Sequence, residues 1–183
     1  MAGESFYDAG VLRQLATNLF YGCGYNFYRA ENQLRADDQL VRSKAASLLG
    51  EAMASVGAAE SAYRREFLPP PTRAKPFPDA GAVAEAQRLE QLAGGIGALE
   101  AALHHQPVPA NDRMTQRYRD EGPTLEKLLR QDERLVGQCE LMRSTVESRD
   151  PAAILLKLPD LQAGLDAIRA TLRDRESLLL SPA

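Results

Sequence analysis

The chain has 183 residues, of which 44% are apolar, and a formal net charge of −3. This length predicts one ordinary domain, and the apolar fraction excludes global disorder because it is enough to fill a core. The 22 basic and 25 acidic residues are mixed along the chain. A concentrated basic surface, typical of proteins that bind nucleic acid or anionic membranes, is therefore not expected.

The apolar residues are mainly Ala and Leu, which favour helices over strands. The first helix is predicted over about residues 8–34, where apolar residues recur at spacings of four and three and form one stripe. A second stripe lies beside it. The first stripe comprises Leu12, Ala16, Phe20, Cys23, Phe27, Ala30 and Leu34, and the second comprises Asn18, Tyr21, Tyr25, Tyr28 and Asn32.

A long second helix is predicted to end near Phe67, with Asp37 or Asp38 as its N-terminal cap. A Pro-rich connector follows over about residues 68–79, because prolines fix φ and hold their predecessors in extended geometry. Asp79 is expected to cap a third helix that ends before Pro107. Its inner face is predicted to carry Leu89, Leu92, Ile96, Leu99 and Leu103.

The fourth helical segment is predicted from Asn111 or Asp112, with a kink or a true break at Gly122-Pro123. Its later part has an apolar seam with a period of about 3.5 residues, made of Leu125, Leu128, Leu135, Cys139, Met142 and Val146. Asp132 interrupts that seam. Either it specifies the register of the bundle, or the helix face rotates outward at that point.

A short helix is expected to begin at Asp150-Pro151 and a last helix at Pro159-Asp160. The sequence thus predicts an all-α fold: a single helical domain over residues 1–183, with about four long helices in a bundle. A short C-terminal helical pair, about residues 150–183, is expected to pack across the bundle or project from it. No segment approaches the roughly 20 apolar residues of a membrane span, and the acidic start does not resemble a secretory signal. A cytoplasmic protein is expected.

Catalytic and metal-binding patterns are absent from the sequence. The only histidines are His104 and His105, and neither has an acidic residue three positions before it, as a di-iron bundle requires. The two cysteines stand far apart, so no zinc-ligand spacing exists. Neither a phosphate-binding loop nor a nucleophile elbow is present. We therefore expect no cofactor, no metal and no catalytic residue.

Two residues keep an alternative open. Cys23 stands between two glycines, which permit close approach of a ligand, although its place on the Phe20/Phe27 stripe equally indicates core packing. His104 lies four residues after Glu100 and is either part of a ligand site or a solvated helix end. A helical-bundle enzyme or a cofactor-binding or metal-binding protein, with its site near Cys23 and His104, is the alternative function. Cys139 is expected in the core.

The distribution of aromatic residues is the best functional clue. Seven of the eleven, namely Phe6, Tyr7, Phe20, Tyr21, Tyr25, Phe27 and Tyr28, fall within the first 28 residues. One helix face cannot bury them all, and tyrosine is enriched at protein–protein interfaces. Tyr21, Tyr25 and Tyr28, with Asn18 and Asn32, either bind a protein partner or fill the bundle edge. The sequence favours a non-enzymatic accessory, assembly or adaptor protein that self-associates or docks on a larger complex.

Overall fold

The computed structural model describes residues 5–21, 34–73, 75–106 and 122–180, apart from the side chains of residues 20, 21, 34–37 and 122–126. All regular structure in these residues is α-helical. The helices are α2 (Ala9–Tyr21), α3 (Leu34–Phe67), α4 (Ala80–His105), α6 (Gly122–Val146), α7 (Pro151–Leu156) and α8 (Leu158–Leu180).

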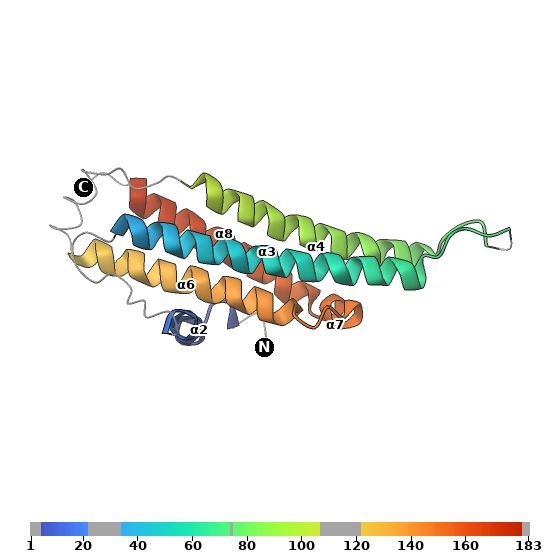
Figure 1. Cartoon of the computed structure of the whole chain (residues 1–183), viewed down its shortest axis with the longest axis horizontal. Helices are drawn as coiled ribbons and strands as arrows, with labels where there is room; N and C mark the ends of the chain where they lie inside the picture. Colours follow the sequence, from blue (N-terminus) through green and yellow to red (C-terminus); the bar gives the residue numbers. More distant parts are fainter. Residues whose placement is uncertain (1–4, 22–33, 74, 107–121, 181–183) are drawn as a thin grey trace.

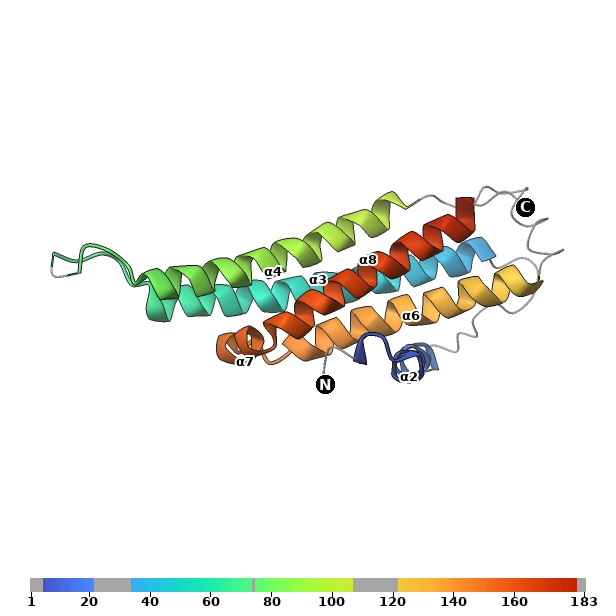
Figure 2. The same cartoon turned by 180° about the vertical axis from the view of Figure 1, so that it is seen from behind.

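Four long helices of the described residues, α3, α4, α6 and α8, run side by side along the molecule (Figure 1). α3 packs against α4 and α6, and α8 packs against the same two helices, so the four close into a bundle. α3 and α6 run in one direction and α4 and α8 in the other (Figures 1 and 2). The predicted all-α bundle of four long helices is confirmed.

The predicted helix starts at two aspartates are confirmed. Asp79 Oδ1 accepts a hydrogen bond from the N–H of Ala82 at 2.8 Å at the start of α4. Asp150 Oδ1 accepts one from the N–H of Ala152 at 3.1 Å, and Pro151 stands in the first turn of α7. α6 begins at Gly122 in the described residues; residues 107–121 lie outside the described part, so the kink or break at Gly122-Pro123 stays a prediction.

The apolar seams also lie where the sequence predicts them. Each of the five residues expected on the inner face of α4 is buried, and so are the described seam residues of α6 from Leu128 to Val146. The seam of α8 comprises Leu161, Leu165, Ile168, Leu172 and Leu179, all buried. Cys139 is fully buried in the same core, as expected.

The first and last helices differ from the expected arrangement. α2 does not form a wall of the bundle but crosses the outer side of α6, where Figure 2 shows it almost end-on. α8, expected within a C-terminal appendage, is the fourth long helix of the bundle. The start of α3 at Leu34 also places Asp38 inside that helix, so its predicted capping role is wrong.

Two glycines explain why α2 and the segment before it dock where they do. A Cβ atom on Gly137 of α6 would lie 2.3 Å from the carbonyl oxygen of Leu12, so only glycine admits the α2 backbone there. A Cβ atom on Gly164 of α8 would lie 2.7 Å from the ring of Phe6. Phe6, Leu12 and Ala16 are consequently buried, and α2 is fixed through one face.

Candidate functional site

A layer of polar residues crosses the bundle at the end where α3 and α6 begin. Each of its four members continues the apolar seam of its own helix: Asp38 precedes Val41, Gln106 follows Leu103, Asp132 precedes Leu135, and Arg175 follows Leu172. All four side chains are buried, and Arg175 is 0% exposed. Asp132 therefore points inward, and the expectation that the helix face rotates outward there is wrong.

Arg175 is the centre of this polar layer. Its Nε donates to Asp132 Oδ1 at 2.7 Å, and its Nη1 donates to Gln106 Oε1 at 3.2 Å. Its Nη2 forms a short ion pair with Asp38 on α3. Arg42 supports the other side of that carboxylate, with its Nη2 2.9 Å from Asp38 Oδ2. One guanidinium thus connects all four walls of the bundle.

The charges in the polar layer balance. Burial acts to lower the pKa of Arg175, but the carboxylates of Asp132 and Asp38 outweigh it and raise the pKa above its ordinary value. Two arginines and two aspartates therefore form a neutral group without access to solvent at its centre. Such an arrangement can fix the relative positions of helices.

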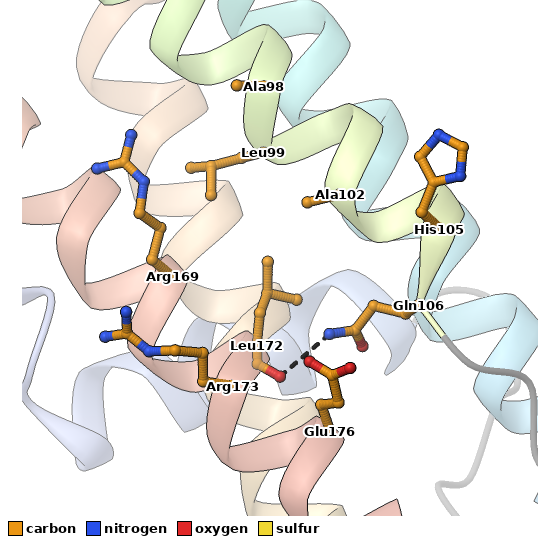
Figure 3. Close-up of a pocket in the computed structure, with 9 residues that line it drawn as sticks. All are labelled: Ala98, Leu99, Ala102, His105, Gln106, Arg169, Leu172, Arg173 and Glu176. Carbon is orange, nitrogen blue, oxygen red and sulfur yellow. Dashed lines mark hydrogen bonds between the residues drawn. The ribbon is translucent and has the colours of Figure 1, made fainter.

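An open groove of about 430 Å³ lies between α4 and α8, next to the polar layer (Figure 3). Ala98, Leu99, Ala102 and Leu172 give it apolar walls. Gln106 belongs to both regions, because its Nε2 donates to the carbonyl of Leu172 at 3.0 Å while its Oε1 accepts from Arg175. Gln106 therefore connects the lining of the groove to the polar layer.

The charged groups around the groove do not converge on one point. In Figure 3 the guanidinium groups of Arg169 and Arg173 lie on one side, and the imidazole of His105 lies on the opposite side. Arg169 Nη1 is 2.8 Å from Asp166 Oδ1 on its own helix. The groove thus has basic side chains on two sides, and the carboxylate side chain of Glu176 also lines it.

α2 presents a second candidate surface. Its inner face, Leu12 and Ala16, is fully buried against α6. On the outer side, Val11 is 43% exposed, and Tyr7, in the turn before α2, is 50% exposed. Asn18 is exposed on the same side and accepts a hydrogen bond from Gln14 Nε2 at 2.9 Å. Over the described part of α2, the stripe that contains Asn18 thus faces solvent, while the Leu12/Ala16 stripe faces the bundle.

Most of the residues predicted for a site lie outside the described part. Cys23, Tyr25, Tyr28 and Asn32 fall in residues 22–33, and Tyr21 is the last residue of α2, without a described side chain. Of the predicted site residues, the structure therefore describes the side chains of only two, Asn18 and His104, and it does not bring these two together.

His104 is exposed in the last turn of α4. Glu100, one turn before it, is half-buried and lies over Gly50 of α3. Burial raises the pKa of the Cys139 thiol, and the Glu140 carboxylate adds to this, so the thiol stays protonated at neutral pH. Among the described residues, no three His, Cys, Asp or Glu side chains gather as a metal site would need.

Gln106 and Arg175 were not predicted as site residues from the sequence, and Asp38 was predicted to cap a helix. The signal was available, because all three occupy seam positions at the spacing of the neighbouring leucines and alanines. Asp38 and Arg175 carry opposite charges at seam positions of different helices, which indicates a buried pair, whereas the uncharged Gln106 gives no such signal.

No known protein family, characterised protein or solved structure matches this chain. None of the described helices combines the length and the apolar character needed to cross a membrane.

Proposed function

We propose that this chain is a non-enzymatic interaction protein, an accessory, assembly or adaptor subunit. It self-associates or docks on a larger protein complex through its aromatic-rich N-terminal helix. The bundle serves as a rigid support, and the outer face of α2 and its continuation carry the contact.

The observation that carries this proposal is the two-sided burial of α2. Leu12 and Ala16 are fully buried, whereas Val11 on the outer side of α2 and Tyr7 in the turn before the helix remain about half exposed. The outer positions Tyr7, Val11, Gln14 and Asn18 are spaced by four, three and four residues, and the same spacing continues through Tyr21, Tyr25, Tyr28 and Asn32. In sequence, the exposed stripe of α2 leads directly into the tyrosine stripe.

Tyrosine suits such a contact because it has a large, rather rigid ring and a hydroxyl group for hydrogen bonding. Asn18 is already exposed and can exchange its hydrogen bond with Gln14 for one to a partner. The buried polar layer supports the same role, since it connects the helices of the bundle.

The test is native mass spectrometry and light scattering on the wild-type chain and on the triple variant Tyr21→Ser/Tyr25→Ser/Tyr28→Ser. Interface tyrosines at hot spots contribute about 2 kcal/mol or more each, so the triple change should weaken assembly at least about 100-fold. Circular dichroism should show nearly unchanged helicity. If the wild type is a monomer, the wild type and the triple variant are each used as bait in affinity capture, and the amount of any other protein that each of them binds is compared.

A matched control removes three exposed apolar side chains elsewhere: Leu40→Ser/Met53→Ser/Leu156→Ser, whose exposed fractions are 42%, 37% and 83%. This control should assemble like the wild type. Assembly that survives in the tyrosine variant, or that is lost equally in the control, would contradict the proposed interface.

A further inference from the structure

The connector between α3 and α4 projects away from the rest of the molecule. The arm is the connector over residues 68–79, and its described residues, 68–73 and 75–79, continue beyond the ends of both helices and beyond α7 (Figures 1 and 2). At its base, the rings of Tyr63 and Phe67 stack with centroids 4.6 Å apart, and Leu68 packs partly against the core. The arm is therefore attached through an ordered joint.

The arm also has internal order. Thr72 and Lys75 exchange backbone hydrogen bonds of 3.0 and 3.1 Å, and the N–H of Lys75 also donates to Thr72 Oγ1 at 3.1 Å. Five prolines restrict φ on either side of this turn: Pro69, Pro70, Pro71, Pro76 and Pro78. A segment fixed in this way loses little conformational entropy when it binds a partner.

The chemistry of the arm differs from that of the whole chain. Phe77, between two prolines, is 84% exposed, the largest exposed fraction among the large apolar side chains of the described residues. Arg73 and Lys75 are exposed, and no acidic residue lies between positions 68 and 78. Asp79, the last residue of the arm, caps α4, so the part of the arm before it carries two positive charges on a protein whose net charge is −3.

We propose that the arm is a docking element for a second protein, whose groove has aromatic walls and carboxylates at its edge. The groove receives Phe77 and its flanking prolines, and the carboxylates pair with Arg73 and Lys75. Aromatic-lined grooves bind Pro-rich segments because the extended backbone is formed in advance. A lipid surface would use the phenylalanine and the two cations but would leave the five prolines without a role. This goes beyond the proposed function, since it adds a contact at another place on the molecule.

The experiment places a photo-crosslinking amino acid on the arm. The full-length variant Phe77→p-benzoylphenylalanine is irradiated in cells of its native host, and each adduct is mapped by mass spectrometry. Leu156→p-benzoylphenylalanine is the matched control, because Leu156 on α7 is 83% exposed. We expect a protein adduct at position 77 at least five times stronger than at position 156, mapped to a segment with aromatic and acidic residues.

Two further measurements complete the test. The charge-reversed pair R73E/K75E should lower the adduct at least fivefold while circular dichroism stays unchanged, and the purified partner should bind Phe77→Ser at least ten times more weakly than the wild type. The proposal is overturned by absence of a protein adduct, by an adduct that survives charge reversal, or by Phe77-dependent co-sedimentation with phosphatidylglycerol vesicles instead. The triple tyrosine variant should retain the adduct, so the two proposals fail separately.

Discussion

The two ends of the bundle are held together by different kinds of contact. Near the arm, α3 and α4 meet through small and medium apolar side chains, namely Val56, Ala59, Ala82, Ala86 and Leu89. At the other end, the polar layer joins all four helices through Arg175. Apolar contacts are non-directional and tolerate a shifted pairing, whereas the polar layer is satisfied in one alignment only. We therefore expect the polar end to set the register of the bundle.

The largest effect is expected from Arg175→Met. This change leaves Asp132 and Asp38 buried without their shared partner, and breaking a buried ion pair from one side costs about 3–5 kcal/mol. The free energy of unfolding, measured by urea titration, should fall by that amount. A loss below about 1 kcal/mol would mean that the two aspartates find other partners. The polar end would then not depend on Arg175, and the proposed difference between the two ends would be wrong.

A compensated variant sharpens this result. Asp38→Leu/Asp132→Leu/Arg175→Met replaces the ionic centre by apolar side chains and should recover most of the lost stability. If the polar layer sets the register, the nuclear magnetic resonance spectrum of this variant should show more than one set of signals. A single sharp set would assign the register to the apolar contacts instead.

In the apolar end, Leu89→Ala is expected to lower the free energy of unfolding by about 3 kcal/mol. Leu89 is fully buried between α3 and α4, and its truncation removes apolar contacts and leaves a cavity. Because no charge is stranded, the effect should be smaller than that of Arg175→Met. The reverse order of the two effects would place the critical contacts in the apolar end.

Local features of the fold were predictable from the sequence because their causes are local. Asp79 and Asp150 cap helices through atoms two or three residues away, and the seam leucines follow the period of a single helix. Asp38 had the same local signature as a cap, but Arg175, 137 positions away, holds it inside α3. A local pattern cannot show which distant charge a side chain will meet.

The position of α2 depends on a glycine, Gly137, because any larger residue there would collide with the α2 backbone. Gly137 lies off the predicted seam of α6, and the backbone of Leu12 rests on it. Neither segment predicts this contact by itself, since the fit appears only when the two helices are placed together. The candidate interface was predictable only as a stripe, and Asn18 is the part of that stripe whose side chain the structure describes.

Gly137→Ala tests a third kind of contact, the close packing of the α2 backbone on α6, which depends on shape alone. The new Cβ would lie 2.3 Å from a backbone oxygen that cannot rotate away, so α2 must shift outward. Overpacking of this kind costs about 1–3 kcal/mol. Hydrogen exchange should show lower protection in α2 and unchanged protection in α4.

Gly94→Ala is the matched control for that change. Gly94 also lies inside a helix, but a Cβ atom there would meet nothing within 4 Å. Replacing an unconstrained helix glycine by alanine should raise the free energy of unfolding by about 0.5–1 kcal/mol. If Gly137→Ala lowers the free energy of unfolding and Gly94→Ala raises it, the effect at Gly137 comes from the contact with α2. If both substitutions change it in the same direction, that explanation is wrong.

The smallest change in stability is expected on removal of a polar contact within the apolar end, the hydrogen bond from the Tyr63 hydroxyl to Glu85. This bond, together with burial, raises the pKa of Tyr63 from 10 to about 12. The folded state therefore holds the phenol proton more tightly than the unfolded state. The resulting stabilisation is fully present below about pH 10 and is lost as the pH rises toward 12.

Tyr63→Phe should lower the free energy of unfolding by about 1 kcal/mol at pH 8, since a single hydrogen bond contributes about that much. Between pH 10 and 12 the wild type should lose this advantage, and the two stability curves should converge. Glu85→Gln keeps an acceptor but removes the charge, so absorbance near 295 nm should report a lower pKa for Tyr63 in that variant. Parallel stability curves would show that the hydrogen bond does not persist in solution. In contrast to Arg175, Tyr63 would then act only through its apolar ring.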